Sequence, residues 1–142
     1  MQTMAQLLAM KGAQVWSISP DATVLEALQL MAEQDIGALV VTERGRPVGV
    51  VSERDYTRKV ILRGRSSRDT PVSTIMTTAF AHTSPQIGVD TCMALMTSQR
   101  TRHVLIMEGD HLRGIVSIGD LVKSTIEEQQ FTIARLEQYI RS

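Results

Sequence analysis

The chain has 142 residues, 43% hydrophobic and only 4% aromatic, so it is long enough to bury an aliphatic core of its own. Its formal net charge is zero. Because nucleic-acid binding normally needs an excess of basic residues, we expect no nucleic-acid partner. The single cysteine, Cys92, excludes an internal disulfide, and its place in a helical run indicates a buried small side chain rather than a nucleophile.

The sequence also predicts neither a membrane-spanning segment nor a metal site. No stretch of the sequence is apolar enough to cross a membrane, and the first residues lack the basic and apolar regions of a signal peptide. We therefore expect a soluble, cytoplasmic protein without a membrane partner. The histidines His82, His103 and His111 lack metal-ligand spacing, so we predict no metal.

The first predicted element is a lead-in helix. Its apolar residues recur at helical spacing and are Met4, Leu7, Leu8 and Met10. The pair Lys11-Gly12 is typical of a helix end. Alternating apolar and polar residues over 14–18 then predict a short strand before the turn at Ser19-Pro20.

A helix, two strands and a second helix follow. The helix is capped by residues 21–23 and carries Val24, Leu28 and Met31 on its inner face. The apolar run over 36–42 predicts a strand that is covered on both faces. A turn separates it from a strand at 48–51, and a helix over 55–62 closes the unit. The predicted order is therefore strand, helix, strand, strand, helix.

The same order recurs 65 residues further along the chain. Residues 15–60 can be laid over residues 80–125 without a gap, and Ser19-Pro20 then falls on Ser84-Pro85. The clearest repeated stretch is Gly-Val-Val-Ser-Glu-Arg-Asp at 49–55, which returns as Gly-Ile-Val-Ser-Ile-Gly-Asp at 114–120. The chain is a duplicated supersecondary unit.

This duplication sets the predicted domain boundaries. We expect a first unit at residues 1–62 that includes the lead-in helix, and a polar, turn-rich linker at 63–71. A second unit follows at 72–125, and residues 126–142 form a helical extension.

Each copy of the repeated motif ends a strand with a serine and has an aspartate three residues later: Ser52 with Asp55, and Ser117 with Asp120. A serine N-cap followed by an acidic residue is an ordinary helix start. Two copies at one spacing favour a further interpretation. Hydroxyl and N–H groups at a helix start can hold a phosphate, and a carboxylate can accept hydrogen bonds from a ribose. The motif thus predicts a nucleotide cradle.

The motif, the Ser-Pro-x-x-x-Val element and the Ile-Gly-Ala-Leu-Val-Val run together resemble a tandem pair of CBS domains, named after cystathionine β-synthase. The resemblance covers nearly the whole chain, is to the free-standing bacterial type and leaves no catalytic domain. It implies an α/β (α+β) fold of two β-α-β-β-α units in a pseudo-two-fold arrangement around a central cleft, followed by a long C-terminal helix. It also implies a regulatory module whose cleft binds AMP, ADP, ATP, NAD(H) or S-adenosylmethionine.

The same resemblance assigns roles to residues. Asp55 and Asp120 are expected to contact ribose, and Ser52 and Ser117 to lie near phosphate or ribose. Apart from these four, we predict that Val15, Ser17, Thr77, Phe80 and His82 belong to the ligand site.

Basic residues near the motif are candidates for phosphate binding. Arg54 and Arg58 stand beside Asp55 or one helical turn beyond it, and guanidinium groups bind phosphate bidentately. A solvated helix face explains them equally well.

The two repeats differ at one segment before the motif. The first has Ile36-Gly37-Ala38, and the second has Thr101-Arg102-His103 at the same offset, so one mouth of the cleft is expected to be small and apolar and the other cationic. Arg102 and His103 are therefore candidate phosphate ligands. The alternative for His103 is a hydrogen-bonded surface residue.

The tail carries a 4-3 spacing that is typical of a coiled-coil seam. Its members are Val122, Ile126, Gln129, Ile133, Leu136 and Ile140. A helix over residues 120–141 would be about 30 Å long, which is too long to bury on so small a module. We therefore predict that it pairs with a second chain in a homodimer. The alternative is a single amphipathic helix that packs on its own unit.

Together these patterns predict a sensor of adenine nucleotides, with AMP or NAD(H) favoured, that signals through its conformation or its affinity for a partner. No catalytic residue or catalytic cofactor is expected, and a protein effector is left open. One alternative is a nucleotide-processing enzyme, but no general base or cluster of metal-binding carboxylates accompanies Asp55 or Asp120. The other is a ligand-free dimerisation module, which the duplicated serine and aspartate positions oppose.

Overall fold

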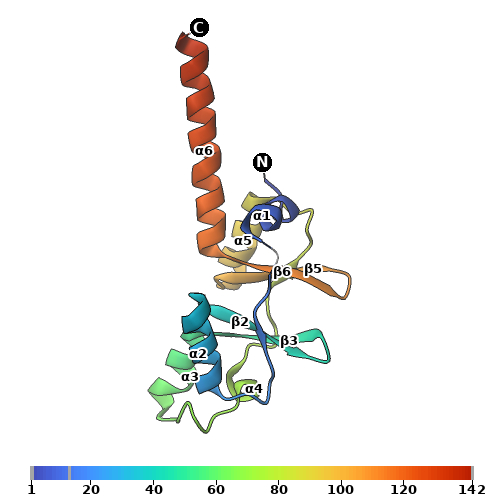
Figure 1. Ribbon diagram of the computed structural model, residues 1–142, viewed down its shortest axis with the longest axis vertical. Coiled ribbons are helices and arrows are strands. Elements are labelled where there is room, and N and C mark those ends of the chain that lie inside the picture. Colours follow the sequence, from blue (N-terminus) through green and yellow to red (C-terminus); the bar gives the residue numbers. More distant parts are fainter. Residues whose placement is uncertain (1, 13, 142) are drawn as a thin grey trace. The chain divides into compact units, whose positions relative to one another are not determined.

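A computed structural model describes residues 2–12 and 14–141 (Figure 1). Its elements are α1 (Met4–Lys11), β1 (Ser17–Ile18), α2 (Val24–Gln34), β2 (Ala38–Glu43), β3 (Arg46–Ser52), α3 (Glu53–Lys59), the 3-10 helix η1 (Ile61–Arg63), α4 (Val72–Ile75), β4 (His82–Thr83), α5 (Val89–Gln99), β5 (His103–Glu108), β6 (His111–Ser117) and α6 (Ile118–Arg141). By contact the chain divides into two compact units. The repeat-1 unit contains residues 14–80 and 110–112, and the repeat-2 unit contains residues 2–12, 81–109 and 113–141.

Each unit contains the predicted strand, helix, strand, strand, helix order. The elements from β1 to β3 recur from β4 to β6 with the same lengths and a constant shift of 65 residues. The helices α2 and α5 even end alike, because Asp35 and Arg100 both adopt the left-handed conformation at φ 52°. The duplicated mixed α+β organisation and the long C-terminal helix are thus confirmed.

Both sheets have three strands, in the orders β1-β2-β3 and β4-β5-β6. The strand β2 is central in its sheet, with β1 parallel to it and β3 antiparallel, and its residues Leu39, Val40 and Val41 are fully buried. This explains why its sequence is continuously apolar rather than alternating.

The outer strands and one helix are shorter than the sequence suggested. Only Ser17 and Ile18 pair with β2, and only His82 and Thr83 pair with β5, so Val15 and Phe80 lie outside the strands. The predicted helix at 55–62 is α3, which ends at Lys59, followed by η1. The chain changes course at Val60, whose side chain is fully buried in the repeat-1 core.

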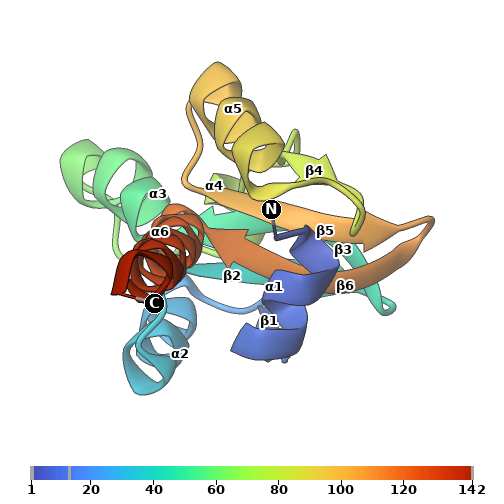
Figure 2. The same cartoon turned by 90° about the horizontal axis from the view of Figure 1, so that it is seen from above.

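The lead-in helix α1 belongs to the repeat-2 unit, although the predicted boundaries grouped it with the first repeat. Met4, Leu7 and Leu8 are buried in the core that α5, β5, β6 and the start of α6 also form, and α1 lies beside β6 in Figures 1 and 2. Met10, expected on the same apolar face, is 73% exposed instead. The repeat-1 unit receives α4 in the same way, since Val72 and Ile75 are buried in its core. Each repeat is therefore completed by the segment that precedes the other.

Two further sequence predictions concern burial and membranes. The side chain of Cys92 is fully buried in the repeat-2 core, as expected, and this burial raises the pKa of its thiol. Among the described residues, no helix combines the length and the apolar character needed to cross a membrane.

The glycine that opens the first motif is required by packing. A Cβ atom on Gly49 would lie 2.7 Å from the Sδ atom and 2.9 Å from the Cγ atom of Met76. Because such overlap forces neighbouring atoms apart, Gly49→Ala should lower the free energy of unfolding by about 1–3 kcal/mol in urea titrations.

Two variants test this packing explanation. Gly119→Ala, where a Cβ would meet only the Ser117 Oγ atom at 3.6 Å, should be neutral or stabilise α6 by up to about 1 kcal/mol. Adding Met76→Ala to Gly49→Ala should give a smaller loss than the two single losses together. Strict additivity would mean that the overlap with Met76 is not the cause.

Candidate functional site

The first motif forms a reciprocal capping box at the start of α3. The Asp55 backbone N–H donates to Ser52 Oγ at 3.2 Å, and the Ser52 backbone N–H donates to Asp55 Oδ2 at 2.9 Å. The Ser52 hydroxyl also donates to Asp55 Oδ2, at 3.0 Å. The serine and aspartate side chains therefore lock one another at the end of β3, and both are half-buried.

The second motif repeats this geometry at the start of α6. The Ser117 backbone N–H donates to Asp120 Oδ2 at 2.8 Å, and the Asp120 backbone N–H donates to Ser117 Oγ at 3.2 Å. The ordinary helix-capping function weighed from the sequence is thus present in both copies. It does not conflict with ligand binding, because a carboxylate has about four lone-pair positions.

The segments predicted to flank each motif lie beside it within their own unit. In the repeat-1 unit the Glu53 N–H donates to the Gly37 carbonyl oxygen at 3.1 Å, and in the repeat-2 unit the Ile118 N–H donates to the Arg102 carbonyl oxygen at 2.9 Å. The segments 36–38 and 101–103 are thus tied to the first residue of α3 and of α6. The sequence difference between these segments is therefore a chemical difference next to each motif.

A lysine accompanies each motif carboxylate, but it comes from a different element in each unit. Lys59, on the same helix as Asp55, lies 3.1 Å from Asp55 Oδ1 and donates to the Ile75 carbonyl oxygen at 2.9 Å. Lys11, at the end of α1, lies 2.6 Å from Asp120 Oδ2 and donates to the Ile115 carbonyl oxygen at 2.7 Å. Each ammonium group is therefore fixed by a carbonyl as well as by the carboxylate.

The surroundings of Asp120 favour its ionised form. Burial alone would raise the pKa of this carboxyl, but the hydrogen bond and charge of Lys11 and the hydrogen bonds from Ser117 outweigh it, so the pKa lies below its ordinary value. Asp120 is therefore a carboxylate at physiological pH.

The other predicted site residues of the repeat-1 unit lie at varying depth. Thr77 is exposed and pairs with Val50 of β3, its N–H donating at 2.8 Å and its carbonyl accepting at 3.0 Å. Arg54 and Arg58 are exposed on α3, and Ser17 is exposed on β1. The remaining members are half-buried or buried: Val15, Ile36, Gly37, Ala38 and Phe80.

In the repeat-2 unit, three further predicted residues stand near the sheet. His82 is exposed on β4 and pairs with Leu105 of β5. Arg102 is exposed just before β5, and His103 begins that strand half-buried. The His103 main chain also bonds to the Thr101 hydroxyl, which donates to the His103 carbonyl at 3.1 Å.

Sequence reasoning did not predict that either lysine pairs with its aspartate. Lys59 follows Asp55 by four residues, a spacing that places side chains together on a helix, so its pairing was available from the sequence. Lys11 gave no such signal, because it stands far from Asp120 in the chain and was interpreted only as part of a helix end. No group of three or more histidine, cysteine or acidic side chains that could hold a metal occurs among residues 2–12 and 14–141.

Comparison with known proteins gives a consistent result. The profile of the CBS domain matches the chain twice, over residues 10–61 and 72–127. The chain is 38% identical over 135 residues to the mitochondrial CBS domain-containing protein CBSX3 of Arabidopsis thaliana. That match covers 92% of this chain but only 65% of the plant protein, so the chain spans just under two thirds of that relative.

Solved structures resemble the whole fold. A candidate signal-transduction protein with CBS domains from Burkholderia ambifaria is 46% identical, with a TM-score of 0.87 over 93% of this chain and 99% of that one. A hexameric CBS-CP12 protein from bloom-forming cyanobacteria is 28% identical, with a TM-score of 0.75 over 90% of this chain and 81% of that one.

The contact between Lys11 and Asp120 predicts that removing the lysine changes the pKa of Asp120 measurably. Met76 stands 65 residues after Lys11, at the equivalent position, so Lys11→Met replaces the cation with the residue that the other repeat uses. Without the ammonium group, the pKa of Asp120 should rise, which carboxyl carbon NMR over pH 2–7 would measure. An unchanged Asp120 midpoint would contradict the ion pair.

The sign of the stability effect follows from the lowered pKa. The pKa of Asp120 is lower in the folded state than in the unfolded state. Its contribution to the free energy of unfolding is therefore fully present above the unfolded-state pKa, and it is lost as the pH falls through the folded-state pKa. Lys11→Met should therefore destabilise the protein near pH 7 by about 1 kcal/mol or less, since both groups are partly exposed. The difference should vanish at low pH, and the matched control Lys123→Met, on the exposed surface of α6, should show no such trend.

Proposed function

Because the chain belongs to the CBS-domain family and carries two copies of the domain, we propose that it is a regulatory module that binds adenosine-containing nucleotides. Its relatives include a candidate signal-transduction protein. The observation that carries the proposal is the duplicated corner of Ser52 with Asp55 and Ser117 with Asp120, in which hydroxyl, carboxylate and backbone N–H groups meet at a helix start. The module binds and reports a ligand and does not catalyse.

Each corner matches the chemistry of a nucleoside. The 2′- and 3′-hydroxyl groups of ribose are donors, and the carboxylates of Asp55 and Asp120 are half-buried acceptors. In Asp55, the Oδ2 atom accepts from Ser52, and the Oδ1 atom faces Lys59. Ribose hydroxyls occupy the remaining lone pairs, and Ser52 and Ser117 stand next to the phosphate.

The segments beside the motifs give the two units different preferences. Ile36-Gly37-Ala38 offers small and apolar groups, which suit an adenine ring or an uncharged part of the ligand. Arg102 is exposed beside the second motif and can pair with a phosphate. The repeat-2 unit therefore prefers the more highly charged end of a ligand. The resemblance to free-standing bacterial members of the family makes AMP or NAD(H) the favoured occupant.

Signalling then proceeds through conformation or through affinity for a partner. The cyanobacterial CBS-CP12 relative is hexameric, which supports self-association for this chain too. A nucleotide that binds one association state more tightly shifts the equilibrium toward it, by as much as the two affinities differ.

The ribose contacts predict a loss of affinity in aspartate variants. Asp55→Asn and Asp120→Asn each replace a charged acceptor with an amide of the same size. Each should weaken binding of AMP or NADH by about 1.5–3 kcal/mol, the usual value of a hydrogen bond to a charged group. Isothermal titration calorimetry measures this difference directly.

The capping role of the same residues requires controls. Circular dichroism and urea unfolding establish that each variant is folded at the titration temperature. Asp110→Asn removes the same charge from the turn between β5 and β6 and should bind like the parent. If the Asp55→Asn, Asp120→Asn double variant keeps full affinity, the motifs do not bind the nucleotide.

The cationic segment predicts a salt-dependent effect. Arg102→Ala should weaken binding of ATP more than of AMP, and the loss should grow as salt is reduced, because a Coulomb interaction is least screened there. Arg113→Ala removes another exposed arginine, one that pairs with Glu108 at 2.9 Å, and should leave the salt dependence unchanged. Calorimetry at 50 and 300 mM salt makes the comparison. Two equivalent sites that are indifferent to Arg102 and to salt would contradict the asymmetry.

A further inference from the structure

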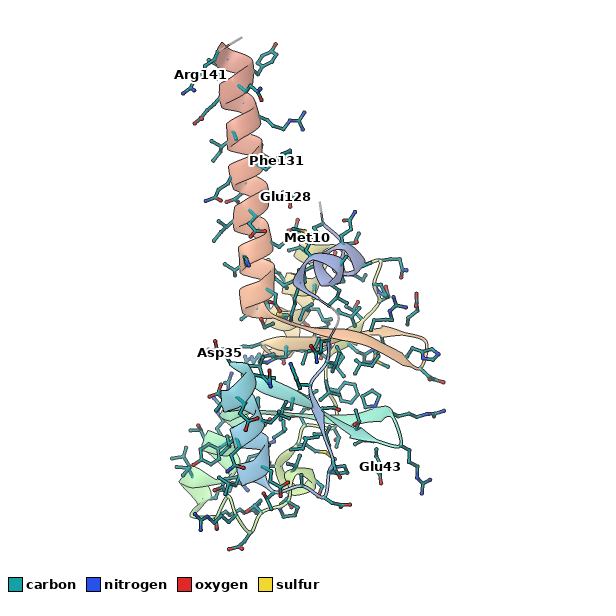
Figure 3. All side chains as sticks on the ribbon, in the orientation of Figure 1. Met10, Asp35, Glu43, Glu128, Phe131 and Arg141 are labelled. Atoms are coloured by element: carbon teal, nitrogen blue, oxygen red, sulfur yellow. The ribbon has the colours of Figure 1, made fainter. Side chains whose placement is uncertain are left out.

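The seam of α6, defined as Val122, Ile126, Gln129, Ile133, Leu136 and Ile140, is uncovered. Its five aliphatic side chains are between 42% and 80% exposed. These residues therefore do not pack the helix back on its own unit, which was the alternative left open by the sequence. Figure 3 shows the end of α6 toward Arg141 extending beyond α1.

The helix does contact its own unit, but through another face. Leu121 and Ser124 are buried there, and Phe131 borders a hollow of about 340 Å³ whose walls also include Met10 and Glu128 (Figure 3). At about 100° per residue, Phe131 lies nearly opposite Ile133 and Gln129 on the helix. The seam is thus a separate face that the helix's own packing leaves free.

We propose that the seam binds the seam of a second copy of this chain, as a parallel, in-register two-helix coiled coil. The spacing of alternating four and three residues is that of a and d positions, and burying them removes their aliphatic groups from water. A second copy fits because it presents the same uncharged seam with the same 4-3 spacing. The hexameric relative supports self-association within the family.

The orientation follows from Gln129. In a parallel pair each seam residue meets its own counterpart, so Gln129 meets Gln129 of the second copy, and the two amides hydrogen-bond. An antiparallel pair that overlaps the whole seam sets Gln129 against Ile133, where a buried amide has no partner. This cost opposes the antiparallel arrangement.

The charges beside the seam give a smaller opposing preference. Lys123 and Glu137 lie on the same flank, so they would meet across an antiparallel pair, whereas a parallel pair places Thr132 next to Glu137. Exposed ion pairs contribute little, and less than an unpaired buried amide costs. The parallel arrangement therefore prevails.

Cross-linking distinguishes the two orientations. In a Cys92→Ala background, Leu136→Cys should form a disulfide-linked dimer under mild oxidation, because the two introduced thiols face one another only in the parallel pair. Gln138→Cys, on the far face of α6, is the matched control and should give little product. A mixture of Ile126→Cys and Leu136→Cys chains that links preferentially to each other would overturn the parallel arrangement, because those positions meet only in the antiparallel pair.

Sedimentation equilibrium tests the seam itself. The full chain of 15.7 kDa should sediment as a multiple of that mass, and Ile133→Asp with Ile140→Asp should remove the α6 contact and lower the mass. Ala134→Asp with Gln138→Asp places the same charges on the opposite face and should leave the mass unchanged. An unaltered mass for the seam variant, or a parent chain that is monomeric at 50 μM, would overturn the proposal.

The outcome is independent of the nucleotide proposal, because the seam lies outside both motifs. The seam variant should still bind AMP or NADH if the aspartates do so, which calorimetry shows separately. A loss of association with intact nucleotide binding supports the seam, whereas intact association with lost nucleotide binding would indicate that Ile133 and Ile140 do not form the interface.

Discussion

The reciprocal hydrogen bonding between a serine and an aspartate at a strand end is the constraint on which each unit depends. It fixes the first turn of α3 directly after β3, and the first turn of α6 directly after β6. The next backbone N–H, on Glu53 or Ile118, holds the loop that leads into β2 or β5. Strand, helix start and loop therefore form one corner, and its half-buried serine and aspartate are the groups proposed to bind a nucleotide.

The sequence predicted this corner because its signals are local or simply repeated. The shift of 65 residues, the Ser-x-x-Asp spacing and the 4-3 pattern of α6 can each be found without knowing a tertiary contact. The partner of Lys11 could not be predicted, because α1 packs in the unit of the second repeat rather than its own. The predicted lengths of the outer strands were wrong for a similar reason. Val15 and Phe80 have strand-like surroundings in sequence, but pairing with a neighbour decides where a strand begins.

In both motifs a lysine pairs with the aspartate, but the lysine comes from a different element in each unit. The position of Lys59 is occupied by Ser124 in the second repeat, and the position of Met76 corresponds to Lys11. Each half-buried aspartate nevertheless has one ammonium partner. A partly buried carboxylate is costly without a compensating cation, so the partner is retained even though the element that supplies it differs.

In the proposed function, this difference would make the two corners unequal as points of control. Lys59 lies on the same short helix as Asp55, so a ligand there would act on α3. Lys11 joins Asp120 to α1, and α6 runs from that corner to the exposed seam. A ribose on Asp120 would share the carboxylate with Lys11, and any coupling between ligand and association must be reciprocal. Within the repeat-2 unit one helix thus connects the proposed ribose acceptor with the seam proposed to bind a second chain, whereas α3 ends at Lys59.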